Sequence, residues 1–173
     1  KETLYGAYKV ANEHSAFVYW SDWQVPSVGL RPNVVYGLGR DQGISAKNSF
    51  AIQAAVLGVP FEIPYTGAYS WLYAGEAAAA FIAAVSYDGE GAPTFDLNGR
   101  CEAMEKGVEV IKTLAPLAQV RCSGAPFPFP PDLDETPLHQ HLPAYPKISM
   151  QQGIQATFDA MRALKQQGRL PAL

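Results

Sequence analysis

The chain has 173 residues and a mass of 18.7 kDa, which fits one ordinary domain. Hydrophobic residues make up 48% and charged residues 17%, so the chain can bury a sizeable core and global disorder is excluded. The formal net charge of -3, with 13 Lys and Arg residues, argues against a nucleic-acid or anionic-membrane surface. No apolar stretch approaches the length of a bilayer span. Two cysteines are too few for a disulfide framework. Since no signal peptide is visible either, we expect a soluble cytoplasmic protein with reduced thiols.

The first part of the chain alternates between helical and extended patterns. The helical segments carry apolar residues at three- and four-residue steps, and glycine or proline follows where each pattern stops. The expected elements are a helix over 5–20, an extended segment over 27–31 and 34–36 that ends at Gly37-Leu38-Gly39, a helix over 47–57, and an edge strand over 61–64.

The second part continues the alternation and then becomes rich in proline. Seven of the 14 prolines fall between Pro126 and Pro146, which predicts a loop or lid with a restricted backbone and no packed element. The other expected elements are a helix over 75–85, a strand over 94–97, a turn at Asn98-Gly99, a helix over 101–114, a strand over 117–121 and an amphipathic helix over 148–167. Alternating strands and helices predict an α/β fold.

Tyr5 and Lys9 carry the most specific chemistry in the sequence. They are four residues apart on an expected helix and therefore share one face. A free phenol has a pKa of about 10 and is a poor base near neutral pH, but a nearby ammonium lowers that pKa. Such a tyrosine can exchange the proton of a hydroxyl or carbonyl group while a cofactor moves hydride. On spacing alone, a surface tyrosine beside a solvated lysine remains an open alternative.

The residues around this pair strengthen its interpretation. The helix contains Tyr5-Gly6-Ala7-Tyr8-Lys9, and about twenty residues later comes Leu30-Arg31-Pro32-Asn33-Val34-Val35-Tyr36-Gly37-Leu38-Gly39. Two weaker motifs follow in order at 73–78 and 95–99. Together they resemble the extended short-chain dehydrogenase/reductase superfamily, and within it the NAD-dependent epimerase/dehydratase family. The resemblance covers nearly the whole chain.

The resemblance implies a cofactor, NAD or NADP, and a set of site residues. Tyr5 is then the catalytic acid/base, and Lys9 is its partner and a ligand of the nicotinamide ribose. The other implied residues are Pro32, Asn33 and Val34 beside the nicotinamide, with Val34, Tyr36 and Arg40 contacting substrate.

The resemblance also implies a domain organisation. Residues 1–40 form the end of an NAD(P)-binding Rossmann domain, and residues 41–173 form mostly a small α/β substrate-binding domain with segments that return to the Rossmann sheet. The glycine-rich dinucleotide motif of the family is absent, and the first residue is not Met, so we expect an N-terminal Rossmann half to be missing. The aromatic residues of the first helix either form a homodimer contact, as is common in the family, or pack within one subunit.

Departures from the family pattern bear on the substrate. Sugar-nucleotide enzymes of this group usually have an Asn three residues after the Arg, where this chain has Val34. This difference favours a smaller sugar, a hydroxy acid or a carbonyl compound as the substrate. Where the family usually has two acidic residues, this chain has Gly75-Glu76, and a purely structural role is enough to explain the one remaining acid. His139 and His141 suggest a metal site, but a solvated loop is the expected state, and we predict no metal.

The sequence thus favours an NAD(P)-dependent oxidoreductase or epimerase-like enzyme that acts by hydride transfer on a small molecule. One alternative is a truncated, inactive half that serves only as a folding or dimerisation module. An unrelated α/β binding domain is a third possibility.

Overall fold

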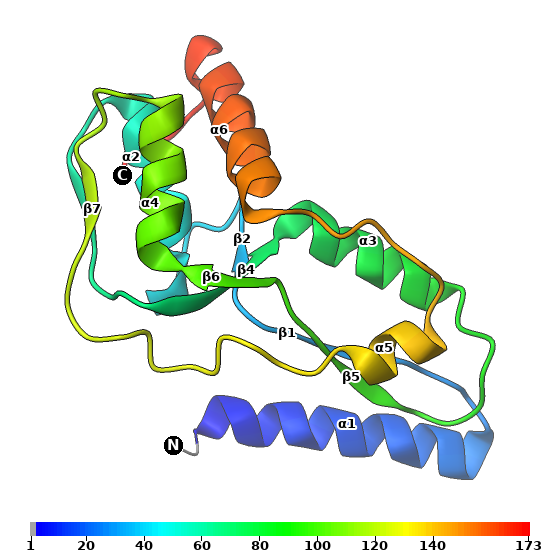
Figure 1. Cartoon of the computed structure of the whole chain (residues 1–173). Helices are drawn as coiled ribbons and strands as arrows, with labels where there is room; N and C mark the ends of the chain where they lie inside the picture. Colours follow the sequence, from blue (N-terminus) through cyan, green and yellow to red (C-terminus); the bar gives the residue numbers. More distant parts are fainter. Residues whose placement is uncertain (1–2) are drawn as a thin grey trace.

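The computed structural model describes residues 3–173 and shows strands and helices alternating along most of the chain (Figure 1). Within this range no helix combines the length and the apolarity needed to cross a membrane. The elements are α1 (Leu4–Trp23), β1 (Gly29–Pro32), β2 (Val35–Tyr36), η1 (Ile44–Ala46), α2 (Lys47–Leu57), β3 (Phe61–Ile63), β4 (Ala68–Tyr73), α3 (Ala74–Val85), β5 (Thr94–Leu97), β6 (Arg100–Ala103), α4 (Met104–Leu114), β7 (Val120–Cys122), α5 (Thr136–His141) and α6 (Met150–Gln166).

The strands form three small sheets in which parallel pairing predominates. β1 pairs with β5 in parallel, with Leu30 opposite Phe95, and β3 pairs with β7 in parallel. In the third sheet β4 lies between β2, which runs parallel to it, and β6, which runs antiparallel. Parallel strands joined by helices confirm the predicted α/β class.

The main core is built around the fully buried Trp71 of β4. Its ring contacts Tyr36 and Tyr69 edge-on, at centroid distances of 5.2 and 5.4 Å. Helices α2, α4 and α6 pack against one another over this aromatic centre (Figure 1). A second, smaller cluster surrounds Leu72 and Phe95, so β4 contributes side chains to both cores.

Several predicted boundaries differ from the structure. The expected extended segment is two strands in two different sheets, because the chain changes neighbours at Asn33: Asn33 donates its N–H to Leu97 O, whereas Val34 O accepts from Leu72 N–H. The expected helix over 101–114 begins only at Met104, because the three residues before it pair with β4 as β6. β4 itself was not predicted.

The prediction of an unpacked proline-rich loop was wrong. This segment contains the short helix α5, and it buries Phe127 in the main core and Leu138 and Leu142 in the smaller cluster. Prolines exclude the segment from the sheets, but the apolar residues between them are free to pack.

Gly107 of α4 offers a direct test of how tightly this core is packed. A Cβ at this position would lie 2.2 Å from the ring of Trp71, which is buried on all sides. We expect Gly107→Ala to lower the free energy of unfolding by about 1–3 kcal/mol through overpacking. Gly6→Ala is the matched control, because its Cβ meets only the Thr3 hydroxyl at 3.4 Å, and alanine stabilises a helix interior by about 0.5–1 kcal/mol. Urea unfolding measures both, and equal stability of the two variants would contradict the packing described.

Candidate functional site

Helix α1 presents Tyr5 and Lys9 on one exposed face. Thr3 caps the helix by accepting the N–H of Gly6, and the four-residue spacing then stacks the two side chains. The Lys9 ammonium lies over the Tyr5 ring, 5.4 Å from its centroid. The structure therefore brings the predicted pair together, and Tyr5 is 72% exposed.

A single ion pair connects α1 to the strand that follows it. Arg31 of β1 donates two hydrogen bonds to the Glu13 carboxylate, at 2.7 and 2.6 Å, which lowers the pKa of Glu13 and raises that of Arg31. The chain reverses between α1 and β1, so the two run in opposite directions (Figure 1). Lys9 precedes Glu13 by four residues, which is about 6 Å along α1, and Asn33 follows Arg31 by two residues, which is about 7 Å along β1. Because the helix and the strand run in opposite directions, Lys9 and Asn33 lie on the same side of the ion pair and at similar distances from it.

The end of β1 is a polar junction. Pro32 is exposed, Val34 is buried, and Asn33 lies between them with its side-chain amide engaged. The Asn33 Nδ2 donates to Asn98 Oδ1 at 2.7 Å and to Pro130 O at 3.0 Å. These two hydrogen bonds hold the Asn33 amide inside the junction.

Two predicted substrate residues occupy different environments. Tyr36 is fully buried and donates its hydroxyl to Met150 O at 3.2 Å, and burial raises the pKa of its phenol. Its side chain is part of the core and does not reach a surface, so its position gives no support to a substrate contact. Arg40 is exposed on the loop after β2, and its guanidinium donates to Ser45 Oγ at 3.0 Å.

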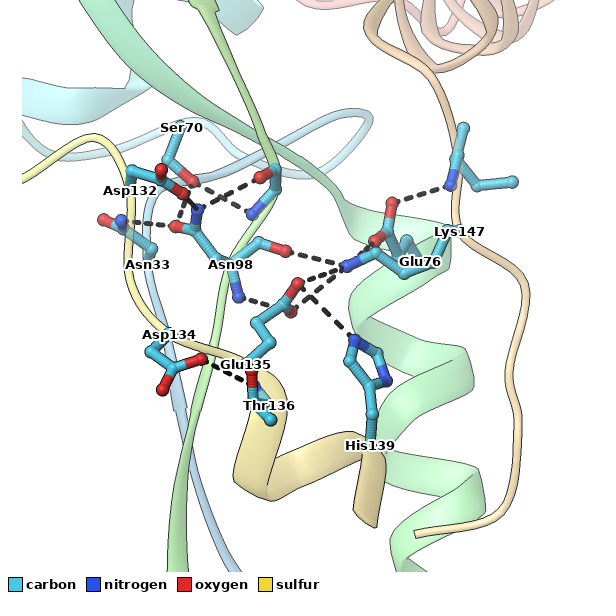
Figure 2. Close-up of polar contacts among 12 residues, drawn as sticks. Asn33, Ser70, Glu76, Asn98, Asp132, Asp134, Glu135, Thr136, His139 and Lys147 are labelled. Atoms are coloured by element: carbon cyan, nitrogen blue, oxygen red, sulfur yellow. Dashed lines mark hydrogen bonds and ion pairs between the residues drawn. The ribbon is translucent and has the colours of Figure 1, made fainter.

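Asn98, between β5 and β6, is the centre of the network that holds this junction (Figure 2). Its Oδ1 accepts from Asn33 and, at 2.9 Å, from the buried hydroxyl of Ser70. Its own N–H donates to Glu135 Oε1 at 2.7 Å. The main-chain oxygen of Asn98 accepts from the Lys147 ammonium at 3.1 Å. One asparagine thus joins β1, β4 and the proline-rich segment.

Lys147 lies between two carboxylates, one of which is buried (Figure 2). Its Nζ is 2.7 Å from Glu76 Oε1, a contact without the alignment of a hydrogen bond, and 2.9 Å from Glu135 Oε2. The side chain of Glu76 has no exposed surface, and its second oxygen accepts the Ile148 N–H at 2.9 Å. Burying a carboxylate costs several kcal/mol unless it is paired, so Lys147 is required by Glu76.

Sequence reasoning missed Ser70, Asn98, Glu135 and Lys147 as parts of the site. No short spacing connects them, since even the nearest two in the sequence, Glu135 and Lys147, are 12 residues apart. His139 and His141 both lie on α5, where His139 Nε2 is 3.8 Å from Glu135 Oε2 and His141 Nδ1 is 2.8 Å from Pro137 O. Among residues 3–173 no group of His, Cys, Asp and Glu is arranged to hold a metal ion.

The comparisons with known proteins agree with these elements. The sequence model of the NAD dependent epimerase/dehydratase family matches residues 1–97, more than half of the chain. The chain therefore belongs to this family, as its motifs predicted. A search of curated proteins finds no significant match.

Solved structures of similar fold include epimerases and a dehydrogenase. UDP-glucose 4-epimerase from Thermotoga maritima, with UDP-glucose, superposes with a TM-score of 0.77 at 20% identity over 93% of this chain and 54% of that one. UDP-glucuronic acid 4-epimerase from Bacillus cereus, with UDP-glucuronic acid and NAD, gives 0.72 at 19% over 92% and 52%. A partial consensus L-threonine 3-dehydrogenase gives 0.75 at 16% over 92% and 56%. At these identities the likeness shows the fold alone, and the chain spans about half the length of these structures.

The pairing of Glu13 with Arg31 predicts that acid weakens the attachment of α1. A carboxyl whose pKa is lowered in the folded state contributes stability above its unfolded pKa and loses it as the pH falls through the folded value. Between pH ~6 and ~3 we expect the amide protection factors of α1, which are exchange rates divided into the intrinsic rate at the same pH, to fall. The fall corresponds to less than about 1 kcal/mol, because the pair is exposed to solvent. The variant Glu13→Gln should show the lower protection factors already at the higher pH, and protection factors with the same pH dependence as in the unmodified protein would contradict the role of this ion pair.

Replacement of Lys147 should be among the most damaging changes to the fold. Lys147→Met leaves the buried carboxylate of Glu76 without its cation, which we expect to cost about 3–5 kcal/mol of unfolding free energy. The exposed Lys106, which pairs with Glu102 on the surface, is the control: Lys106→Met should cost less than about 1 kcal/mol.

The double variant Glu76→Gln with Lys147→Met tests the cause. If the damage comes from the unpaired charge, removing that charge restores part of the loss in urea unfolding. A double variant as unstable as the sum of the two single variants would show that the ion pair is not responsible.

Proposed function

We propose that this chain supplies the catalytic helix and the substrate-binding part of an NAD(P)-dependent oxidoreductase or epimerase. The observation that supports this most strongly is the contact of Lys9 with Tyr5, in a chain of the NAD dependent epimerase/dehydratase family. The same proposal assigns residues 1–40 to the end of the cofactor domain and residues 41–173 mostly to the substrate domain.

The residues present fit one end of the cofactor. Pro32 is the last residue of β1, a strand that is parallel to β5, and ligands of α/β proteins bind at the carboxyl ends of parallel strands. Asn33 and Val34 follow directly, on the side where Lys9 lies. The sequence has no glycine-rich turn for a diphosphate, so these residues would hold only the nicotinamide ribose. The Bacillus cereus structure contains NAD, which supports this cofactor type.

Tyr5 and Lys9 would divide the proton chemistry between them. When bound, the nicotinamide accepts or returns hydride at a carbon that bears a hydroxyl or carbonyl group. Tyr5 gives its hydroxyl proton to that oxygen or, as phenolate, takes the proton from it, and the Lys9 ammonium beside Tyr5 would bind the nicotinamide ribose. Whether the net result is oxidation or epimerisation is decided by what the substrate does between the two transfers.

The junction at Asn33 favours a small substrate over a sugar nucleotide. The position at which related sugar-nucleotide enzymes carry asparagine is the buried Val34, and the neighbouring Asn33 is bound to Asn98 and Pro130. A hydroxy acid, a small sugar or a simple carbonyl compound needs fewer hydrogen-bond partners from the protein there. The fold accommodates such a change, since its neighbours bear the names of both UDP-sugar epimerases and an L-threonine dehydrogenase.

Replacing Tyr5 by phenylalanine tests the proposal. In the longest form of the protein that its source encodes, Tyr5→Phe should lower kcat of NAD(P)-linked turnover by about 100-fold to 10,000-fold, because the acid/base group is lost. The ring stays in place, so cofactor affinity measured by fluorescence titration should change little.

Tyr8→Phe is the matched control, since Tyr8 is on the same helix and 68% exposed, against 72% for Tyr5. It should leave kcat within about twofold of the unmodified protein. Undiminished turnover in Tyr5→Phe would remove the basis of the proposal.

A second candidate function is that of a folding or dimerisation module. None of the residues of α1 is buried, and large apolar side chains along it are exposed, among them Phe17, Tyr19 and Trp23. Such a surface is normally covered by protein, either another part of the same polypeptide or a second copy. An intact mass near 18.7 kDa with no response to NAD(P)H, together with a dimer in sedimentation, would favour this candidate.

A further inference from the structure

The side-chain amide of Asn33 has a fixed orientation. Its nitrogen donates to Asn98 Oδ1 at 2.7 Å and to the main-chain oxygen of Pro130 at 3.0 Å. A main-chain oxygen can only accept a hydrogen bond, so the nitrogen has to face Pro130 and the amide cannot be turned over. The Oδ1 atom of Asn33 therefore points away from Asn98, as Figure 2 shows.

This oxygen is an unused hydrogen-bond acceptor. Among residues 3–173 no group donates a hydrogen bond to Asn33 Oδ1. In contrast to the unpaired side-chain oxygens of Ser27 and Tyr65, it is not buried, so a ligand can reach it. Its neighbours in the chain offer no alternative, because Pro32 has no N–H and Val34 is buried and apolar. Within residues 32–34, the Asn33 oxygen is thus the side-chain atom able to recognise a polar group.

The side chain of Asn33 lies on the side of β1 that faces α1. Alternate residues of a strand point to the same side, and Arg31, two residues earlier, reaches Glu13 of α1. Asn33 is about 7 Å from this ion pair along β1, whereas Tyr5, eight residues before Glu13, is about 12 Å from it along α1. The levels of Tyr5 and Asn33 along the helix axis therefore differ by about 5 Å.

The network behind Asn33 keeps this acceptor in place. Asn98 Oδ1 also accepts from the Ser70 hydroxyl at 2.9 Å. The main chain of Asn98 is bound by Glu135 at its N–H and by Lys147 at its oxygen. An acceptor whose position is fixed before a ligand arrives loses little entropy on binding. Because an amide oxygen is neutral, it accepts from a hydroxyl group without requiring a charge on the ligand.

We propose that Asn33 is a specificity-determining residue, whose Oδ1 accepts a hydrogen bond from a hydroxyl group on the carbon next to the reacting carbon of the substrate. The oxygen of the reacting carbon lies at the Tyr5 hydroxyl, and the neighbouring hydroxyl with its hydrogen bond spans the remaining distance to Asn33. This inference rests on the proposed function, because Tyr5 determines the place of the reacting carbon.

The inference narrows the substrate class. Small sugars, polyols and hydroxy ketones carry a hydroxyl donor next to the reacting carbon. A simple carbonyl compound has none, and in a 2-hydroxy acid the neighbouring carbon is a carboxylate, which only accepts hydrogen bonds. The Asn33 oxygen therefore favours the first group over the other two.

Pairs of ketones in which a methyl group replaces a hydroxyl test the proposal. In the longest encoded form of the protein with NAD(P)H, hydroxyacetone is compared with 2-butanone, and 3-hydroxy-2-butanone with 3-methyl-2-butanone. The members of each pair have nearly the same size. Since a hydroxyl also makes the neighbouring carbonyl more reactive, the decisive quantity is how the ratio of the two kcat/KM values changes when Asn33 is replaced.

Asn33→Ser should lower this ratio by about tenfold, the effect of one hydrogen bond, because the shorter side chain does not present an acceptor at the same place. Asn12→Ser is the matched control, since it makes the same exchange at an exposed position of α1, and it should leave the ratio unchanged. Thermal unfolding shows that each variant is folded. A ratio that is the same in Asn33→Ser and in the unmodified protein would overturn the proposal.

A binding measurement on the unmodified protein keeps the proposal testable if Asn33→Ser does not fold. With NAD(P)+, which cannot reduce the ketones, ligand-observed NMR compares the affinities of the two members of each pair. We expect the hydroxy member to bind about tenfold more tightly. Equal affinities, tighter binding of the methyl member, or failure of both members to bind would overturn the role of Asn33.

The outcomes separate this inference from the proposed function. Tyr5-dependent turnover with a ratio that does not depend on Asn33 would overturn the inference and keep the enzyme. Tighter binding of the hydroxy members that is lost in Asn33→Ser, without turnover of any ketone, would keep the role of Asn33 and count against the proposed reaction. Weaker NAD(P)H binding by Asn33→Ser with an unchanged ratio would assign the oxygen to the cofactor and overturn the proposal.

Discussion

The burial of the Glu76 carboxylate is the constraint on which the arrangement of the site depends. A carboxylate with no exposed surface requires a cation, and the cation comes from Lys147, far along the chain. To reach Glu76, Lys147 brings the end of the proline-rich segment against α3. The same ammonium also contacts Glu135 and Asn98 O, so one charge fixes three segments (Figure 2). Prolines restrict how this segment bends, and the ion pair determines where it ends.

This constraint extends to the residues beside which a cofactor is proposed. Asn98, positioned by Lys147 and Glu135, accepts a hydrogen bond from Asn33 at the end of β1, and Pro130 O accepts a second one from the same side-chain nitrogen. Residues from the part of the chain that we propose as the substrate domain therefore set the geometry of a strand that we propose as part of the cofactor domain. Hydrogen-bond networks of this kind are strong when every member is satisfied. The junction is then a rigid support for chemistry at its surface.

Local patterns predicted the parts of the molecule that depend on local physics. The pairing of Tyr5 with Lys9 follows from helical spacing, and α2, α3 and α6 follow from periodicity and from residues such as Gly58 that end helices. β4 could not be found this way, because its run from Tyr69 to Leu72 is buried on both faces and shows no alternation. The cation that pairs with Glu76 could not be predicted either, since nothing in the spacing of charges distinguishes Lys147 from the other lysines.

Helix α1 is the one helix of the described residues that has no buried residue. It carries the proposed catalytic pair, yet it buries none of its residues and is attached to β1 mainly through Glu13 and Arg31. Most of the stability of a helix in a protein comes from the packing of its apolar face, and an exposed ion pair adds little. A catalytic phenol requires a position fixed to within about 0.5 Å, which such an attachment does not provide. Under the proposed function, a protein surface that covers the apolar side chains of α1 would supply both the missing burial and the missing rigidity of the catalytic pair.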